Sequence, residues 1–181
     1  CYGVIGSNGS GKTTLLKLIL NDLKPDLGFI ARDKRLTCAY MAQEVDLAPD
    51  ATAFEIVRQG AAMILSLEAE LAELEGRFSD PAYYTHEKRL VRLIDQQEQA
   101  LAAYNKLGGP GLEGQIRALL STIGFQDHEM HLPVKHLSGG QKKLLGLARI
   151  IIGRPDILLL DEPDNHLDFK GKALLEKLID D

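Results

Sequence analysis

Cysteine is scarce in this sequence, and so are several features that would assign the chain to other protein classes. The two cysteines, Cys1 and Cys38, form no spaced disulfide framework, so a reducing, cytoplasmic setting is expected. No apolar run approaches the roughly 20 residues of a membrane-spanning helix, and no signal-peptide pattern is visible. These absences argue against direct insertion into a membrane.

The chain also has fewer positively charged residues than negatively charged ones. The 181 residues contain 21 Lys and Arg against 26 Asp and Glu, a net charge of −5, which argues against broad nonspecific coating of nucleic acid. A local basic patch stays open. Hydrophobic residues make up 45% of the chain, enough to exclude a disordered protein. The length predicts one domain with a real core, with room for a subdomain. The first residue is not Met, and a strand is predicted from that residue on, so we expect natural N-terminal sequence to be missing.

Two further patterns are incomplete. The stretch Asn105-Lys106-Leu107-Gly108 lacks the final aspartate of the guanine-binding motif Asn-Lys-x-Asp. In His128-Glu129-Met130-His131 the second histidine comes one residue too early for the zinc motif His-Glu-x-x-His. Guanine specificity and zinc-dependent proteolysis are therefore not supported.

A glycine-rich stretch near the N-terminus carries the strongest signal. Residues 6–14 read G-x-x-x-x-G-K-T-T, between a predicted strand at 1–5 and a predicted helix to about Leu20. Glycines let the backbone turn tightly and bring N–H groups to phosphate oxygens, and the helix N-terminus attracts the same anion. Lys12 would add a full charge for the β- and γ-phosphates, and the Thr13 hydroxyl would bind Mg²⁺. The stretch therefore predicts nucleotide phosphate binding.

A second chemical segment lies near the C-terminus. Ile157–Leu160 is predicted to be a buried parallel strand, and Asp161 and Glu162 follow at its carboxyl end, where open α/β sheets bind ligands. Asp161 would hold Mg²⁺ through water, and Glu162 would orient or deprotonate an attacking water. Taken alone, the two carboxylates are equally compatible with a functional site and with an ordinary turn at the end of a strand. Short strands are also predicted at Phe29–Ala31 and Leu36–Met41, with Gln43 just past the second.

The middle of the chain changes character. Residues 53–107 contain apolar residues at alternating spacings of three and four, first Ile64, Leu67, Leu71, Leu74 and Phe78, then Leu90, Ile94, Leu101 and Tyr104 with Gln97 in the same stripe. This pattern predicts an antiparallel helical hairpin that is interrupted at Asp80-Pro81 and ends at Gly108–Gly111. Its second helix, at about 25 residues, would be roughly 37 Å long. A third helix is predicted near 112–123, closed by Gly124.

Four cations gather near the predicted turn of this hairpin: Arg77, Lys88, Arg89 and Arg92. An ordinary solvated helix face is one explanation. The other is a projecting arm that contacts phosphate on a partner.

The segment Leu137-Ser138-Gly139-Gly140-Gln141 precedes a predicted helix to Ile152. Ser138 can cap this helix, and the glycines allow an anion to approach its N-terminus. At this point the chain resembles an ATP-binding cassette of the ABC type. The matching motifs are Walker A at 6–14, the Q-loop Gln43, the signature at 137–141, Walker B at 157–161 with Glu162, and the D-loop Asn165-His166-Leu167-Asp168. The D-loop sequence and the hairpin before the signature look most like the first cassette of the soluble ABC-F group.

The resemblance implies a fold and roles. The fold would be an α/β P-loop NTPase, with a mainly parallel core sheet at 1–52 and 136–181 and a helical subdomain at 53–135 that carries the arm at about 53–107. ATP and Mg²⁺ would be the cofactors. Glu162, Gln43 and Lys12 would be catalytic; Thr13, Gln43 and Asp161 would serve the metal. The nucleotide would contact Gly6, Ser7, Asn8, Gly9, Ser10, Gly11, Lys12, Thr13 and Thr14, and residues Ser138, Gly139, Gly140, Gln141 and Asp168 would act across the interface with a second cassette.

The sequence also departs from the family pattern. Asp164 stands where Thr or Ser usually follows Glu-Pro, which adds a carboxylate near Glu162. The switch histidine after the D-loop and the aromatic residue that stacks on adenine are absent from these 181 residues. Three functions stay open: a cytoplasmic ABC-F ATPase acting on the ribosome, the nucleotide-binding component of a membrane transporter, and a non-hydrolysing scaffold whose arm does the work.

Overall fold

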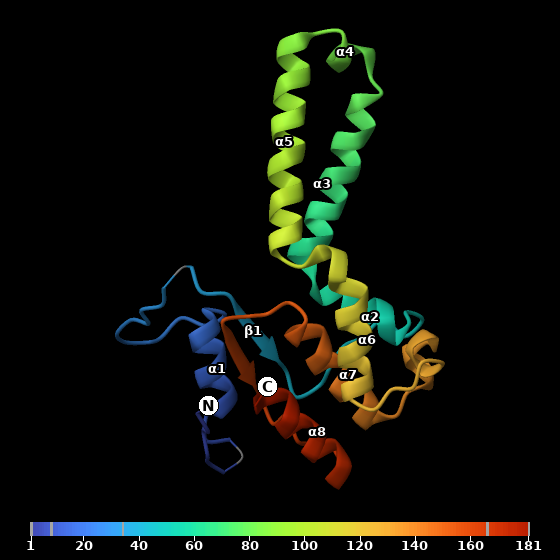
Figure 1. The fold of residues 1–181 in the computed structure, drawn as a ribbon. Helices are drawn as coiled ribbons and strands as arrows, with labels where there is room; N and C mark the ends of the chain where they lie inside the picture. The colour runs from blue at the N-terminus through green and yellow to red at the C-terminus, as the bar shows by residue number, and fades with distance from the viewer. Residues whose placement is uncertain (1, 8, 34, 166, 181) are drawn as a thin grey trace.

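The computed structural model describes residues 2–7, 9–33, 35–165 and 167–180. Within them the elements follow in the order α1 (Lys12–Leu20), β1 (Cys38–Met41), α2 (Ala53–Gly60), α3 (Ala62–Phe78), α4 (Pro81–Tyr84), α5 (Glu87–Lys106), α6 (Leu112–Thr122), α7 (Gly139–Ile151), β2 (Ile157–Leu160) and α8 (Phe169–Asp180). Short 3₁₀ turns lie at Gly109–Gly111, Glu129–His131 and Val134–His136. Figure 1 shows a body from which α3 and α5 project together as a hairpin.

The described sheet is a parallel pair, β1 beside β2, with Cys38 opposite Ile157 and Met41 opposite Leu160. The pairing continues at both ends, since Ile157 N–H donates to Thr37 O and Asp161 N–H donates to Met41 O, each at 3.0 Å. At the start of the pair the Asp156 carboxylate accepts from the Thr37 backbone N–H and hydroxyl, both at 2.7 Å. The ends of β1 and β2 are thereby brought to one edge, where Gln43 and Asp161 follow.

Two strand predictions are wrong for the described residues. Residues 2–5 are not in a strand, and Tyr2 and Ile5 are almost fully exposed, while Cys1 lies outside the described residues. Residues 29–31 are also irregular, and β1 begins at Cys38 rather than at Leu36. A strand requires a hydrogen-bonded neighbour, and among the described residues none pairs with either segment. Apolar, β-prone sequence alone is not enough.

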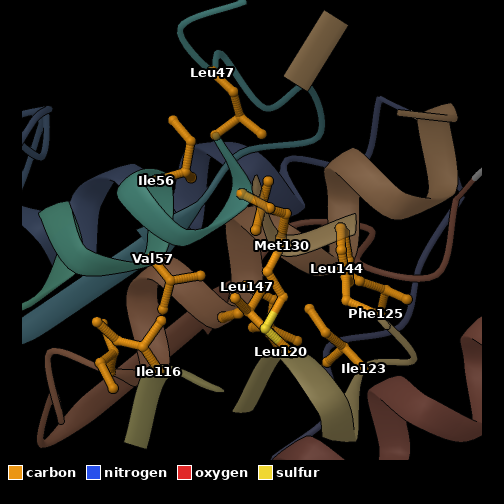
Figure 2. Packing of buried hydrophobic residues seen from close by; sticks show 14 of the residues in the cluster. Leu47, Ile56, Val57, Ile116, Leu120, Ile123, Phe125, Met130, Leu144 and Leu147 are labelled. Atoms are coloured by element: carbon orange, nitrogen blue, oxygen red, sulfur yellow. The ribbon is translucent and has the colours of Figure 1, made fainter. Parts of the chain in front are cut away.

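The main core lies where α2, α6 and α7 meet. Ile56, Ile116, Leu120, Leu145 and Leu147 are fully buried there, and Figure 2 shows side chains from these helices pointing toward one another around Met130. The helices approach closely where a residue has no side chain. A Cβ built at Gly60 would lie 1.7 Å from Arg149 O, so only glycine allows α2 to end against α7.

The helical arm consists of α3, α4 and α5, with α4 at its tip (Figure 1). Sequence periodicity predicted that it starts at residue 53, but α2 packs into the core and ends at Gly60, so the hairpin begins at Ala62. Helix α5 has 20 residues and is therefore about 30 Å long, shorter than predicted. As predicted, the Asp80 carboxylate caps α4 and Pro81 occupies its first turn.

The contact between the two arm helices differs from the prediction on one side only. On α3 the predicted stripe is buried or half-buried. On α5 the buried residues are Leu93 and Ala100, whereas Ile94 and Leu101 are 40% and 47% exposed. Helix α5 carries apolar residues on more than one face, so spacing alone could not identify which face meets α3.

Candidate nucleotide-binding site

The glycine-rich loop leads directly into α1. Gly9 and Gly11 have φ values of +81° and +93°, a left-handed conformation that other residues rarely adopt. Gly11 is also the N-cap of α1, so the unpaired N–H groups of the first helical turn face the loop. The positive end of the helix dipole points the same way. The local geometry therefore places backbone N–H donors and the positive end of the helix dipole at the loop.

Lys12 lies over this loop. Its Nζ donates to Gly6 O at 2.9 Å and to Ser7 O at 3.2 Å, and it lies 3.9 Å from Glu162 Oε1. The loop carbonyls thus hold the ammonium group beside the helix N-terminus. Lys12 and Glu162 come from opposite ends of the sequence and meet across one cavity.

Asp161 is the buried carboxylate of the site, with 5% of its surface exposed. Its Oδ2 accepts a hydrogen bond from the Thr13 hydroxyl at 2.6 Å and another from the Tyr40 hydroxyl at 3.1 Å. Burial raises the pKa of Tyr40, and its hydrogen bond to the Asp161 carboxylate raises it further. The contact between Thr13 and Asp161 joins the glycine-rich loop to the end of β2.

Glu162 adopts a strained backbone conformation, with φ +47°. Its Oε2 accepts from Asn165 Nδ2 at 2.6 Å, and its carbonyl accepts from Lys143 Nζ at 2.7 Å. Asn165 thereby holds the Glu162 carboxylate at the cavity, and Lys143 holds the Glu162 main chain. An orienting partner of this kind is what a water-positioning carboxylate needs.

The cavity has a volume of about 390 Å³ and is lined by Gly9, Gly11, Lys12, Thr13, Thr14, Gln43 and Glu162. These residues come from the loop, the end of β1 and the end of β2. A second cavity of about 690 Å³ lies at the base of the arm, between the start of β1, the junction of α2 and α3, and the end of α7. The second cavity is the more apolar one and contains none of the predicted site residues among those described.

The signature residues lie elsewhere on the body. Ser138 caps α7 through a reciprocal capping box, in which Gln141 N–H donates to Ser138 Oγ at 3.2 Å and Ser138 N–H donates to Gln141 Oε1 at 2.9 Å. Within the described chain, residues 138–141 are not part of the lining of the 390 Å³ cavity. Asp168 is also outside that lining, and its Oδ1 accepts from Gly171 N–H at 2.7 Å at the start of α8.

Asp164, the unusual carboxylate, has its own partner. Lys172 Nζ lies 3.0 Å from Asp164 Oδ2, and this hydrogen bond lowers the pKa of Asp164. The ion pair ties the loop after β2 to α8. Two predicted or singled-out positions, Asn8 and His166, lie outside the described residues.

Sequence reasoning assigned no role to Tyr40, Lys143 or the Asn165 side chain. Lys143 had a detectable signal, because it lies one turn before Leu147 on an apolar face of the predicted helix. The signal for Tyr40 was weaker, since Tyr40 lies on the strand that ends shortly before Gln43. Their contacts join segments far apart in sequence, so neither partner could be named in advance.

Comparison with known proteins decides the family. A family model described as "ABC transporter" matches residues 1–165, most of the chain. The chain belongs to this family. It is an ATP-binding cassette that is similar to those of ABC-F proteins, with the α/β fold that the motifs implied.

Curated relatives match almost the whole chain. The energy-dependent translational throttle protein EttA of Haemophilus influenzae is 30% identical over 179 residues, covering 99% of this chain and 31% of EttA. The probable ATP-binding protein YheS of Escherichia coli K12 is 34% identical over 175 residues, covering 97% of this chain and 25% of YheS. The cassette thus spans between a quarter and a third of the length of these relatives.

Solved structures agree on the fold. A metal-chelate type ABC transporter in an inward-facing conformation is similar with a TM-score of 0.60 and 22% identity, covering 97% of this chain and 55% of the transporter chain. At this identity the likeness concerns the fold alone. Within the described residues, none of the helices combines the length and apolar character required to cross a membrane.

Proposed function

We propose that this cassette binds and hydrolyses ATP and that its conformational cycle controls the ribosome association of an ABC-F translation factor. One observation carries the hydrolytic part. The 2.6 Å contact between Thr13 Oγ1 and Asp161 Oδ2 and the 3.9 Å contact between Lys12 and Glu162 bring phosphate-binding and carboxylate groups to one cavity of about 390 Å³.

The loop fits a polyphosphate. The backbone N–H groups at the start of α1 and the Lys12 ammonium are hydrogen-bond donors, and the ammonium also carries a positive charge. Phosphate oxygens accept such hydrogen bonds and are attracted to that charge. Lys12 is held by the Gly6 and Ser7 carbonyls, so its charge is already beside the loop.

The oxygen donors fit Mg²⁺. A magnesium ion in nucleotide sites takes one or two protein oxygens and completes its shell with phosphate and water, and when bound it neutralises phosphate charge. Thr13 and Asp161 would hold it, since their oxygens already meet at 2.6 Å. Tyr40 keeps the Asp161 carboxylate oriented, and Gln43 lines the same cavity.

Glu162 would position the attacking water. Asn165 and Lys143 hold its carboxylate and carbonyl, so little conformational freedom is lost when the reaction begins. Lys12 would stabilise negative charge on the transferring phosphoryl group. Intact Lys12, Asp161 and Glu162 argue against a purely structural scaffold.

The signature segment would act on a second cassette. Ser138 and Gly140 start α7, whose N-terminus favours an anion, yet the lining of the chain's own cavity does not include them among the described residues. We therefore propose that they bind the γ-phosphate of ATP held by a partner cassette, and that Asp168 lies at the same interface. Closure of the two cassettes would depend on bound ATP.

The ribosome part of the proposal draws on the relatives and the arm. EttA is named as a translational throttle protein, and the match covers 99% of this chain and 31% of EttA. The arm extends from the body, and none of its described residues lines the cavity, so we infer that it contacts a partner other than the nucleotide. A cytoplasmic location follows from this proposal.

The four arm cations differ in their contacts. Arg77 is paired with Glu73 and lies over the Tyr83 ring, and Arg89 donates to Ala82 O at 3.0 Å, so both support the tip itself. Lys88 and Arg92 lie one turn apart on α5, are exposed, and take part in no ion pair within the described chain. These two would provide the phosphate contact.

Hydrolysis is tested with Glu162→Gln in the full-length protein. The variant should bind ATP as tightly as the wild type and lose turnover, because the carboxylate acts mainly in the transition state. Wild-type turnover in Glu162→Gln would disprove the role assigned to Glu162. No turnover in the wild-type protein itself would favour the scaffold.

Ribosome binding is tested by co-sedimentation of full-length Glu162→Gln protein with ribosomes in ATP. Lys88→Ala/Arg92→Ala should weaken association and reduce its salt dependence. Lys17→Ala/Lys24→Ala removes the same charge from exposed positions on the body and serves as the control. Failure of Glu162→Gln to associate at all would favour a transporter component. Association that is insensitive to the tip variant would keep the ribosome and discard the tip contact.

A further inference from the structure

Lys143 is a buried charge that the proposed reaction does not use. It lies on α7, two residues after the signature motif, and is 5% exposed. Among the described residues, Lys143 and Asp161 are the buried polar or charged side chains. A buried ammonium group requires strong compensation, so its partners reveal why it is there.

Those partners are main-chain carbonyls at the two segments that meet at the cavity. Lys143 Nζ donates to Glu162 O at 2.7 Å and to Gln43 O at 3.3 Å. Glu162 follows β2 and Gln43 follows β1, and both side chains line the cavity. One ammonium group therefore crosslinks both strand ends to the first turns of α7.

The backbone of Glu162 needs such support. Its φ of +47° is unfavourable for a residue with a side chain and persists only when neighbouring groups hold it. Besides Lys143, the Asn165 N–H donates to the same carbonyl at 3.2 Å. Loss of the Lys143 contact would leave the strained peptide less constrained and the carboxylate less well oriented.

The electrostatic surroundings agree with this role. Burial lowers the pKa of Lys143, and the carboxylates of Asp164, Glu162 and Asp161 oppose that shift. Asp164 stands where the family usually has Thr or Ser, and its negative charge lies near the Lys143 ammonium. Lys143 thus offsets part of the repulsion among carboxylates that surround the cavity.

We propose that Lys143 is a positioning residue for hydrolysis. It holds the main chains of Gln43 and Glu162 in place against the first turns of α7. Displacement of the α7 N-terminus, as when Ser138 and Gly140 engage a partner's nucleotide, would reach Glu162 through this side chain. The inference rests on the proposed ATP hydrolysis and adds a residue to it.

The test compares Lys143→Met, Lys143→Arg and Lys142→Met in the full-length protein. Methionine keeps the length and apolar stem but removes the donor and charge. Because hydrogen bonds to charged groups are among the stronger ones, kcat should fall about tenfold in Lys143→Met while KM for ATP changes little. The thermal unfolding midpoint should also change little, because the variant loses the hydrogen bonds but no longer has to bury a charge. Lys143→Arg retains a charged donor and should recover most of kcat. Lys142 has no side-chain hydrogen bond among the described residues, so Lys142→Met should match the wild type.

Each outcome has one meaning. Wild-type kcat in Lys143→Met, together with lost turnover in Glu162→Gln, overturns the inference and leaves the proposed function intact. A parallel loss of unfolding midpoint, ATP affinity and kcat, without recovery in Lys143→Arg, shows a merely structural role and also overturns it. Wild-type turnover in Glu162→Gln removes the role of the Glu162 carboxylate and overturns the inference, whereas no turnover in the wild-type protein removes the proposed function and the inference with it.

Discussion

Replacement of Lys12 by alanine tests the phosphate site most directly. Lys12 Nζ is held by Gly6 O at 2.9 Å and Ser7 O at 3.2 Å, and its side chain is 20% exposed. Both carbonyls can be hydrated in the variant, because these hydrogen bonds lie at the surface. Lys12→Ala should therefore change the free energy of unfolding by less than about 1 kcal/mol.

The effect on nucleotide binding should be much larger. A charge-assisted hydrogen bond contributes about 1.5–3 kcal/mol, and each 1.4 kcal/mol changes the dissociation constant tenfold. Lys12→Ala should thus weaken ATP binding by roughly 10- to 150-fold. The loss for ADP should be smaller, since the lysine in such loops serves the β- and γ-phosphates.

Isothermal titration calorimetry with ATP and with ADP, each in the presence of Mg²⁺, measures both effects. Lys17→Ala is the matched control, because Lys17 lies on the same helix, is exposed and is outside the cavity lining. The control should bind both nucleotides as the wild type does. Equal affinity of Lys12→Ala and Lys17→Ala for ATP would refute the phosphate site.

Three further predictions concern the arm, the sheet and the need for a second cassette. Leu93→Ala should cost about 2–5 kcal/mol locally because Leu93 is 1% exposed between the arm helices. Hydrogen exchange should then rise in α3 and α5, whereas the 40% exposed Ile94→Ala should change it little; equal effects would contradict the observed packing. The hydrogen bonds from Thr37 lower the pKa of Asp156, so this carboxylate stabilises the fold above its ordinary pKa and loses that contribution as the pH falls below it. Asp156→Asn should therefore unfold at a lower temperature than wild type at pH 7 and converge with it in acid; a constant difference would argue otherwise. The isolated 181-residue chain should hydrolyse ATP slowly, and fast turnover by a demonstrated monomer would speak against sites completed by a second cassette.

Local chemistry could be read from the sequence because it depends on neighbours along the chain. The glycine spacing in 6–14, the Ser138 cap of α7 and the Asp80-Pro81 start of α4 each involve residues within a few positions of one another. Steric and hydrogen-bonding rules over such short distances leave few alternatives. The motifs and their order also identified the cassette before any contact was known.

Pairing between distant segments required the tertiary structure. Sequence alone placed a strand at 1–5 and put Ile94 and Leu101 in the arm contact, because a β-prone run and an apolar spacing are compatible with several partners. Only packing decides which partner is present: α3 meets the face of α5 that carries Leu93.

The same distinction divides the candidate site. Sequence named Lys12, Asp161 and Glu162, because each belongs to a local motif with known chemistry. It could not name the contacts of Tyr40 with Asp161 or of Lys143 with the Glu162 carbonyl. Those contacts exist because β1 pairs with β2 and α7 packs beside the strand ends, which brings residues far apart in sequence within hydrogen-bonding distance.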